Sequence, residues 1–193
     1  MVKLLVIRHG KTQWNLDKKI QGQRDIPLCA EGIAELETCR IPGEFSAFQW
    51  ISSPLIRAQQ TAQLLGAKDL SLEPSLIEMD WGGWDGYSLA ELRSKYGAAM
   101  TIEETKGLKM CPPGGESPAD VAMRVGRWLK CLRHDTIAIT HKGVIRALKS
   151  LAYDWDMTDK SPVKFDWSAG HLFELDTEGM PAPVRVNIRL KSA

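Results

Sequence analysis

The sequence has almost no excess charge and no long apolar run. Its 25 Lys and Arg residues are balanced by 24 Asp and Glu residues, so the net charge of +1 offers no broad electrostatic footprint for nucleic acid or an anionic membrane. No apolar stretch approaches the roughly 18 residues that a membrane span needs. The N-terminus begins with a strand-like run instead of a signal peptide. We therefore expect a cytoplasmic protein that binds neither nucleic acid nor membranes, and any anion that it binds must be bound locally.

Closely spaced cysteine pairs are also absent. The four cysteines form no C-x-x-C pair, so we expect reduced thiols; they are Cys29, Cys39, Cys111 and Cys131. With 44% hydrophobic and 25% charged residues, the composition is that of an ordinary globular protein. The length favours one domain over residues 1–193, large enough to bury about 70% of its unfolded surface.

Short apolar runs alternate along the chain with segments of helical periodicity. Leu4 to Ile7 and Ile137 to Ile139 are continuous apolar runs, which are typical of strands covered on both faces, and Phe48 to Ile51 is a weaker example. Helical patterns follow: they extend from Pro54 to about Leu65 with Ser53 as cap, from Ser117 to Leu132, and from Val144 to Ala152. Gly170 to Leu175 and Val184 to Leu190 alternate like partly exposed strands. This order predicts an α/β fold with a largely parallel sheet.

The segment from Pro74 to Gly115 is rich in glycine and proline and has no clear place in this alternation. Loops of this length in compact domains usually cover a functional site. We expect it to pass over one end of the sheet and not to link two domains.

Three of the predicted strands end in side chains that suit one chemistry. The first ends in Arg8-His9-Gly10, another in Ser52-Ser53-Pro54 with Arg57 one helical turn later, and the third in Thr140-His141. A lone histidine at a strand end is more often structural, and a lone arginine near a helix start is more often solvated. If the strands are parallel neighbours, however, two histidines and two arginines meet at the edge where such folds bind ligands.

These four side chains suit a phosphoryl group. Guanidiniums present planar forks of donors to phosphate oxygens, and a glycine after His9 is consistent with a tight turn whose N–H groups approach a ligand. At ~4 Å and an effective dielectric near 20, each charge pair is worth about 4 kcal/mol before desolvation is subtracted. A neutral imidazole is a competent nucleophile, and nearby arginines disfavour its protonation.

Four stretches resemble the motif regions of the histidine phosphatase superfamily, in its phosphoglycerate-mutase-like branch. In chain order they are LLVIRHGKTQWN, SSPLIRAQQTA, LIEMDWGGWDG and ITHKGVIRAL, and they extend from residue 4 to residue 148. The resemblance implies a single α/β domain with the phosphoglycerate-mutase-like fold, in which a mainly parallel central sheet is flanked by helices in three layers.

The resemblance also implies roles for individual residues. It makes His9 the nucleophile that becomes phosphohistidine, and it places Arg8, Arg57 and His141 around the transferring phosphoryl group. It makes Glu78 the proton donor, a role that requires a protonated carboxyl and hence a raised pKa. Asn15 adds a phosphate contact; Gly10, Thr12, Gln21, Gly22 and Arg24 are the further candidates for substrate binding.

Two positions near these motifs, Lys11 and Arg24, can each be interpreted in two ways. Lys11 stands where relatives usually have an acid or an amide, and pairing with a surface acid is favoured over a role at the phosphate entrance. Arg24 lies in a segment, Gln21 to Asp25, that resembles a substrate-side loop and is equally explained as a turn. His134 and His171 match no catalytic motif, and we expect them to be structural or solvated.

Hydrolysis is favoured over isomerisation. Cofactor-dependent mutases of this family are longer and carry paired arginines in an insertion after the proton donor. Between Glu78 and Pro112 this chain offers only single cations, Arg93, Lys95, Lys106 and Lys109. A shorter cap admits water and lacks groups that would retain a phosphorylated intermediate.

The sequence therefore predicts a metal-independent phosphomonoesterase without cofactor, acting on a small phosphate ester through a phosphohistidine. A phosphoglycerate mutase, an alpha-ribazole phosphatase and a catalytically silent phosphate-binding relative are the alternatives. A metal site at His9 and His141 lacks a third ligand of suitable spacing, and adjacent arginines repel a cation. The seven tryptophans are explained by core packing at Trp50 and Trp128, whereas Trp14, Trp81 and Trp84 are candidates for an apolar wall against the leaving group. Oligomeric state cannot be predicted.

Overall fold

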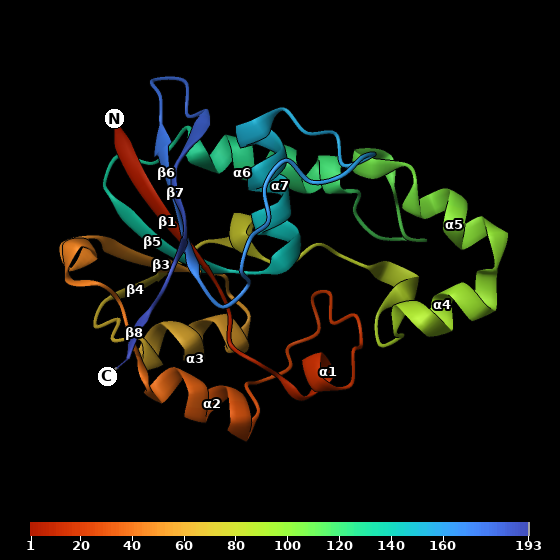
Figure 1. Ribbon diagram of the computed structural model, residues 1–193, viewed down its shortest axis with the longest axis horizontal. Coiled ribbons are helices and arrows are strands. Elements are labelled where there is room, and N and C mark those ends of the chain that lie inside the picture. The colour runs from red at the N-terminus through yellow and green to blue at the C-terminus, as the bar shows by residue number, and fades with distance from the viewer. Residues whose placement is uncertain (193) are drawn as a thin grey trace.

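A mixed six-stranded sheet forms the centre of the molecule (Figure 1). The computed structural model describes residues 1–192, with side chains as far as Leu190. In sheet order the strands are β4 (Leu70–Leu72), β3 (Gln49–Ser52), β5 (Thr136–Thr140), β1 (Val2–Arg8), β6 (Gly170–Leu175) and β7 (Pro181–Ile188). β2 (Cys39–Arg40) and β8 (Lys191–Ser192) form a separate two-stranded sheet.

The parallel part of the sheet contains the three strands whose ends were singled out. β5 lies between β1 and β3 and pairs in parallel with both. On the far side of β1, β6 pairs antiparallel with β1, and β7 pairs antiparallel with β6. The register places Arg8 beside Thr140 and Ser52 beside Ile139. The carboxyl ends of all three strands therefore meet at one edge, as the sequence predicts.

Helices cover both faces of this sheet, which gives the three-layer α/β fold. One face packs against α2 (Ala30–Glu37) and α3 (Ile56–Leu64), and the other against α6 (Pro118–Leu129) and α7 (Lys142–Tyr153) (Figure 1). Alternate residues of β1 serve the two layers: Leu4 and Val6 join the α6–α7 core, and Leu5 and Ile7 join the α2–α3 core. Their continuous apolar run is explained by burial on both faces.

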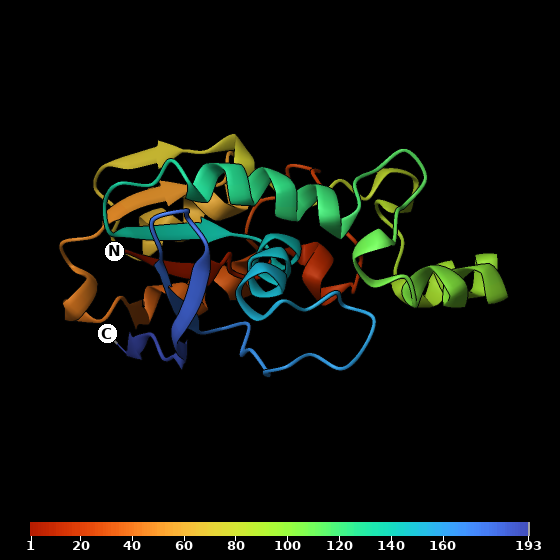
Figure 2. The same cartoon turned by 90° about the horizontal axis from the view of Figure 1, so that it is seen from above.

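The glycine- and proline-rich segment projects beyond the carboxyl edge of the sheet (Figure 2). It contains α4 (Leu89–Tyr96), α5 (Ala98–Glu104) and the 3-10 turns η3 (Gly82–Trp84) and η4 (Gly107–Lys109). We call residues 82–110 the cap. The cap has its own small core of Trp84, Leu92 and Met100. The expected excursion over one end of the sheet is therefore confirmed. It contains two helices, α4 and α5, that the sequence did not predict.

Backbone hydrogen bonds attach the cap to the body at three places, one of which joins Ile20 to Gly86 and Tyr87, each at 2.8 Å. The Gly83 N–H donates to the Pro113 carbonyl at 2.9 Å, and the Leu108 N–H donates to the Asp156 carbonyl at 2.8 Å. At Gly107, with φ of +56°, an added Cβ would collide with that Asp156 oxygen. Glycine is therefore required where the cap approaches the loop after α7.

Two expectations about single elements were wrong. α3 begins after Leu55 and not at Ser53, because the Ser53 hydroxyl contacts His141. β6 is mostly buried, and only β7 is largely exposed, between its buried ends Pro181 and Ile188. The remaining elements are α1 (Gln13–Leu16), η1 (Gly43–Phe45) and η2 (Pro74–Leu76). No helix within residues 1–192 has the length and apolarity needed to span a membrane.

Candidate active site

His9 follows β1 directly and its proton position is fixed by the chain. Its Nδ1 lies 2.7 Å from the Gly10 carbonyl oxygen. Because a carbonyl can only accept, Nδ1 carries the proton and Nε2 keeps a free lone pair. The side chain is 6% exposed, and the His9 N–H donates to the Thr140 carbonyl at 2.9 Å, which fixes the end of β1 against β5.

His141 lies beneath His9 and is fully buried. The two ring centroids are 5.0 Å apart, and His141 Nε2 is 2.7 Å from Ser53 Oγ. That hydroxyl already accepts the Leu55 N–H at 3.3 Å, so its own proton is available for His141 Nε2. In this arrangement the ring proton of His141 is on Nδ1. No residue in the described part of the chain accepts a hydrogen bond from this N–H.

Two arginines supply positive charge at the same end of the site. Arg57 on α3 is fully buried and donates to the carbonyls of Arg24 at 2.7 Å and Gly22 at 2.8 Å. Burial lowers the pKa of Arg57 to about 10, which still leaves it charged at neutral pH. The Nε atoms of Arg57 and Arg8 have no acceptor in the described part of the chain.

The surroundings keep both imidazoles neutral. Burial lowers the pKa of His9 well below its usual value, and the charges of Arg8 and Arg57 lower it further. The pKa of His141 is lowered by burial first, and then by His9 and the same arginines. Neutral His9 is the nucleophilic form of an imidazole.

Glu78 follows η2 and is 8% exposed. Its Oε1 accepts hydrogen bonds from the Met79 N–H at 2.8 Å and the Gly143 N–H at 3.0 Å. These bonds lower its pKa, but burial raises the pKa by more, so the carboxyl holds a proton more readily than an exposed glutamate. Arg124 and Gln23 both donate to the Glu78 carbonyl, which fixes the backbone of this residue.

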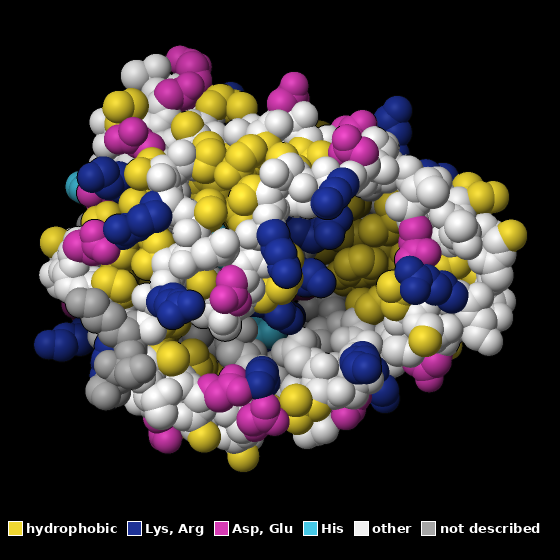
Figure 3. Space-filling model, viewed as in Figure 1, with side chains coloured by type: hydrophobic (Ala, Val, Ile, Leu, Met, Phe, Trp, Pro, Cys, Tyr) yellow, Lys and Arg dark blue, Asp and Glu magenta, His cyan; other side chains and the backbone are white. Residues whose placement is uncertain are grey.

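A cleft of about 500 Å³ opens over these groups (Figure 3). In that view Lys and Arg side chains gather along one side of the hollow, and hydrophobic side chains form the other. Basic residues of the cleft are Arg8, Lys18, Lys19, Arg57, Lys142 and Arg146, and its apolar residues include Ile20, Trp81, Trp84, Met100, Met110 and Met157. Glu78 and Glu104 are the acids that line it, so the cleft carries an excess of positive charge.

The structure brings most of the predicted residues together. Arg8, His9, Asn15, Gln21, Gly22, Arg57 and Glu78 line the cleft, and His141 supports it from below. Asn15 Oδ1 accepts from the Thr12 N–H at 3.0 Å. Its amide group is therefore oriented by the start of α1.

Three predicted substrate contacts lie outside the cleft. The Gly10 N–H donates to Thr61 Oγ1 at 2.9 Å, so it does not face a ligand. Thr12 is fully buried and its hydroxyl donates to Gln21 at 2.9 Å. Arg24 is paired with Asp85 at 3.5 Å and is mostly exposed.

Lys11 forms surface ion pairs and does not approach the cleft. Its ammonium contacts Glu31 at 2.6 Å and also Glu35, both on α2. The two carboxylates raise the pKa of Lys11. The interpretation as a surface pair is therefore the correct one of the two.

Sequence reasoning missed Ser53, Gly143, Lys142 and Arg146 as parts of the site. Lys142 and Arg146 are present in the stretch ITHKGVIRAL, four residues apart after His141. That spacing places both side chains on one face of a helix that starts at the site. This helical spacing could have predicted that they line the site. Of the tryptophans in the motif loops, Trp81 and Trp84 line the cleft and Trp14 does not.

Comparison with known proteins identifies relatives of this arrangement. The model of the histidine phosphatase superfamily (branch 1) matches residues 4–188. The chain is 34% identical over 131 residues to the 2,3-bisphosphoglycerate-dependent phosphoglycerate mutase of Methylobacterium radiotolerans, a match that covers 63% of this chain and 62% of the mutase. The chain thus spans less than two thirds of the length of that relative.

Solved structures match over nearly the whole chain. Phosphoserine phosphatase from Entamoeba histolytica, in complex with 3-phosphoglyceric acid, has a TM-score of 0.78 and 26% identity, with 97% of each chain covered. TTHB049 from Thermus thermophilus has a TM-score of 0.72 and 30% identity, and the match covers 98% of this chain and 99% of that one. These similarities extend across the sheet, both helical layers and the cap.

Proposed function

The chain belongs to the histidine phosphatase superfamily, branch 1, and on that premise we propose that it is a metal-independent phosphomonoesterase that acts on a small phosphorylated metabolite. One observation carries the proposal: in the cleft, His9 has a free Nε2, packs against His141 and lies beside Arg8 and Arg57. Glu78, a carboxyl with a raised pKa, lines the same cleft. These are the groups that a two-step transfer through phosphohistidine needs.

In the first step His9 Nε2 attacks the phosphorus atom. The bond between phosphorus and the ester oxygen breaks, and Glu78 donates its proton to the departing alkoxide. Negative charge on the equatorial oxygens is stabilised by Arg8, by Arg57 and by the Nδ1–H of His141. At ~4 Å and an effective dielectric near 20, each pair of an arginine and a phosphate charge contributes about 4 kcal/mol before desolvation is subtracted, whereas neutral His141 contributes a hydrogen bond.

In the second step water attacks the phosphorus of phosphohistidine. The Glu78 carboxylate takes a proton from this water, the bond between nitrogen and phosphorus breaks, and inorganic phosphate leaves. His9 Nε2 regains its lone pair and Glu78 regains its proton. Both groups have therefore returned to their starting states.

Hydrolysis is supported over transfer back to the product by the composition of the cap. The cap contains four cations, Arg93, Lys95, Lys106 and Lys109, and none of them lines the cleft. Arg93 is paired with Glu104 at 2.7 Å, and Lys106 with Glu103. The cap thus offers no cation at the cleft to hold a phosphorylated intermediate, although the relatives that match by sequence are named as mutases.

The first experiment measures aryl phosphate hydrolysis in excess chelator and traps the acid-labile phosphoenzyme in parallel. We expect His9→Ala to abolish both signals, because the nucleophile is removed. His134→Ala, an exposed histidine outside the cleft, is the matched control and should keep both. Loss of activity in chelator would contradict a metal-independent reaction. Trapping without turnover, together with interconversion of phosphoglycerates, would establish a mutase instead.

Glu78→Gln should slow alkyl phosphates more than aryl phosphates, by about 10²-fold or more for the alkyl esters. The reason is that an aryl oxide leaves without prior protonation. The ratio of kcat/KM for the two substrate types is the measurement. Glu37→Gln, an exposed glutamate on α2, controls for the loss of one negative charge. Equal losses on both substrate types would exclude Glu78 as the acid.

A further inference from the structure

The backbone around Glu78 is bound by side chains from distant parts of the chain. Residues 77–81, which we call the acid loop, connect η2 to η3. Arg124 on α6 donates from Nη1 to the Ser75 carbonyl at 2.6 Å and from Nη2 to the Glu78 carbonyl at 3.2 Å. Gln23 donates to the same Glu78 carbonyl at 3.1 Å. The position of Glu78 therefore depends on two side chains that lie 46 and 55 residues away along the chain.

Arg124 is oriented by a carboxylate. Glu116 accepts a hydrogen bond from Arg124 Nε at 2.9 Å and another from Nη2 at 3.1 Å, so the two side chains form a bidentate ion pair. The pair is partly buried, with Arg124 19% and Glu116 25% exposed. Two bonds to one carboxylate fix the plane of the guanidinium, and its Nη groups then face the two carbonyls of the loop.

Glu116 also binds the acid loop itself. Its Oε2 accepts the Asp80 N–H at 3.0 Å, and its own N–H donates to the Asp80 carbonyl at 2.8 Å. The two segments approach closely: a Cβ at Gly115 would lie 2.5 Å from the Asp80 oxygen, and a Cβ at Gly82 would lie 2.4 Å from the Pro113 oxygen. The acid loop therefore cannot shift without displacing the segment before α6.

Gln23 connects the acid loop to the phosphate-binding side of the site. The carbonyls of its two neighbours, Gly22 and Arg24, accept hydrogen bonds from the Arg57 guanidinium at 2.8 and 2.7 Å. Its own amide reaches the Glu78 carbonyl. Three consecutive residues thus contact both Arg57 and Glu78, and they fix the distance between these two groups.

The Glu78 carboxyl needs this support because little else holds it. In the described part of the chain, the Gly143 N–H at 3.0 Å is the group outside the acid loop that binds the carboxyl. A carboxyl held at one point can turn about that point. Its direction is therefore set by where the Glu78 backbone lies.

We propose that Arg124 and Gln23 are positioning residues that hold the Glu78 carboxyl where it can transfer a proton to the leaving group. The inference rests on the proposed role of Glu78 as the acid. Neither side chain is among the described residues that line the cleft, so each acts through the Glu78 backbone. A displacement of about 1 Å at a reacting group can reduce a rate by about 10²-fold, which makes such support important for catalysis.

Arg124→Gln is tested with ethyl phosphate and 4-nitrophenyl phosphate, whose leaving groups differ in their need for a proton. We expect kcat/KM to fall by at least about tenfold for ethyl phosphate and by much less for 4-nitrophenyl phosphate. Because kcat/KM includes only the steps up to departure of the leaving group, the ratio of the two values isolates the acid. Arg124→Lys keeps the charge with fewer donors and should recover part of the ratio.

The second step of the reaction gives an independent readout. Glu78 must also take a proton from water, so Arg124→Gln should hydrolyse phosphohistidine slowly. With 4-nitrophenyl phosphate we expect a burst of about one 4-nitrophenol per protein molecule, then a steady rate slower than that of the wild type. A loss of folded protein alone would lower burst and steady rate together and would leave the substrate ratio unchanged.

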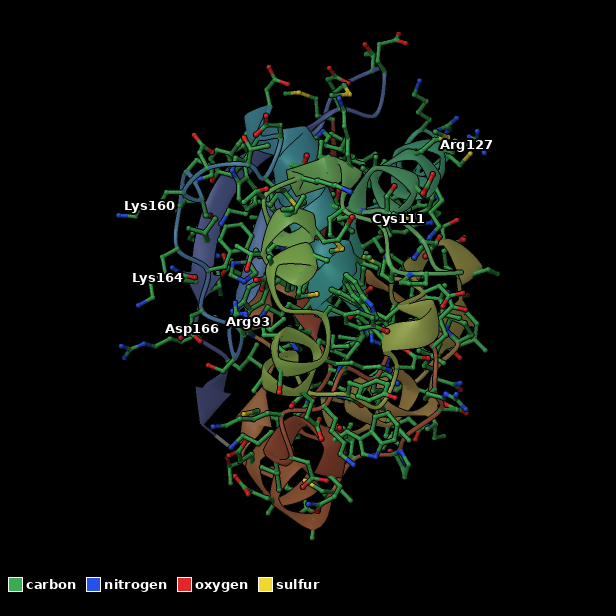
Figure 4. All side chains as sticks on the ribbon, turned by 90° about the vertical axis from the view of Figure 1, so that its right-hand side faces the viewer. Arg93, Cys111, Arg127, Lys160, Lys164 and Asp166 are labelled. Atoms are coloured by element: carbon green, nitrogen blue, oxygen red, sulfur yellow. The ribbon has the colours of Figure 1, made fainter. Side chains whose placement is uncertain are left out.

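Further variants show whether Arg124 acts through Glu78. In a Glu78→Gln background, Arg124→Gln should not lower the ratio further, because no acid is left to position. Gln23→Met and Glu116→Gln each remove part of the support and should lower the ratio less than Arg124→Gln does. Arg127→Gln is the matched control and should keep the ratio, since Arg127 Nη2 lies 3.2 Å from Met123 Sδ and the side chain points outward from α6 in Figure 4.

The outcomes distinguish this inference from the proposed function. Circular dichroism identifies folded variants, and Arg124→Lys and Glu116→Gln take the place of Arg124→Gln if the latter does not fold. If Glu78→Gln lowers the ratio but these folded variants do not, the inference alone is refuted. A further fall of the ratio in the Glu78→Gln background refutes it as well. If Glu78→Gln itself leaves the ratio unchanged, the proposed role of Glu78 fails, and the inference fails with it.

Discussion

Three histidines of this protein are buried, two at the active site and one in the core. His9 and His141 are kept neutral next to arginines in the cleft, whereas His171 is buried in β6 away from it. The His171 ring stacks on Phe165 with centroids 3.9 Å apart, and its Nδ1 accepts the Asn187 N–H at 3.2 Å. Burial lowers the pKa of His171 to about 4. This packing agrees with the expectation that His171 is structural.

His171 should make stability depend on pH. As pH falls below the ordinary histidine pKa near 6.5, the unfolded chain takes up a proton that the folded protein excludes until about pH 4. The free energy of unfolding therefore decreases over this window, by up to about 3 kcal/mol from this residue. His171→Phe removes the proton site, so its stability should fall less between about pH 7 and about pH 5 in denaturant titrations.

His134→Gln is the control for this comparison, since that histidine is exposed in a loop. His171→Phe also leaves the Asn187 N–H without its partner, but that cost is the same at every pH. A variant whose stability falls as steeply as that of the wild type would show that His171 is not the group responsible.

Single site residues could be predicted where a strand end fixes their position. His9, His141 and Arg57 are of this kind, because parallel strands bring their carboxyl ends to one edge. Glu78 depended on a resemblance, since no periodic pattern distinguishes it from other loop acids. The contact of Ser53 with His141 requires β3 to lie beside β5, which the order of elements along the chain does not reveal.

The first turn of α7 couples the helix to the acid of the site. His141 precedes the helix, Lys142 begins it, and the Gly143 N–H holds Glu78 Oε1 at 3.0 Å. A Cβ at position 143 would collide with that oxygen and would lie 3.2 Å from the Met79 Cβ. Glycine is needed here for space and not for a left-handed backbone.

Gly143→Ala should therefore impair catalysis although it favours the helix. Alanine is better than glycine in a helix by up to about 1 kcal/mol, yet the added methyl displaces the Glu78 carboxyl. We expect kcat on alkyl phosphates to fall by about tenfold or more, with a smaller loss on aryl phosphates.

Gly126→Ala in α6 is the matched control, because its Cβ would meet only a Leu151 methyl at 3.8 Å. It should keep full activity and gain stability. Equal activity of the two variants would show that Glu78 tolerates displacement.

Helix starts could be predicted only where the capping residue has no other partner. Ser117 and Asp120 form the expected capping box at the start of α6. Ser88 and Glu91 form the same box at α4, a signal that is present in the sequence and was not used. Ser53 looks equally suitable, but its hydroxyl is held by a histidine 88 residues later in the chain.

The cleft is closed on its far side by segments that are distant in sequence. η4 of the cap and the loop after α7 meet at Gly107 and Asp156, and Met110 and Met157 extend from them into the cleft wall. The cap core of Trp84, Leu92 and Met100 is small, so the attachment to the body governs where this wall lies. The sequence predicted the excursion but not its contact with residue 156, because nothing in either segment marks the pairing.

Gly107→Ala tests this attachment. With φ of +56° and the Asp156 oxygen in the path of a Cβ, the variant should cost more than the ~1 kcal/mol expected for a left-handed alanine alone. The amides of α4 and α5 should exchange faster with solvent, which hydrogen exchange measures.

Gly114→Ala provides the reference, since Gly114 has φ of +73° and open space around it. It carries the backbone cost without the collision. If both variants lose the same stability and exchange alike, the contact at Asp156 does not hold the cap.

The division between strand ends and cap has an evolutionary consequence. The nucleophile and its neighbours are set by the central sheet, while Met100, Met110 and Met157 come from segments outside it. Substitutions in those segments alter which molecules fit and leave the reacting groups in place. After a gene duplication, one copy could therefore acquire a new substrate by changes in residues 98–110 and 154–158 alone, with its chemistry inherited intact.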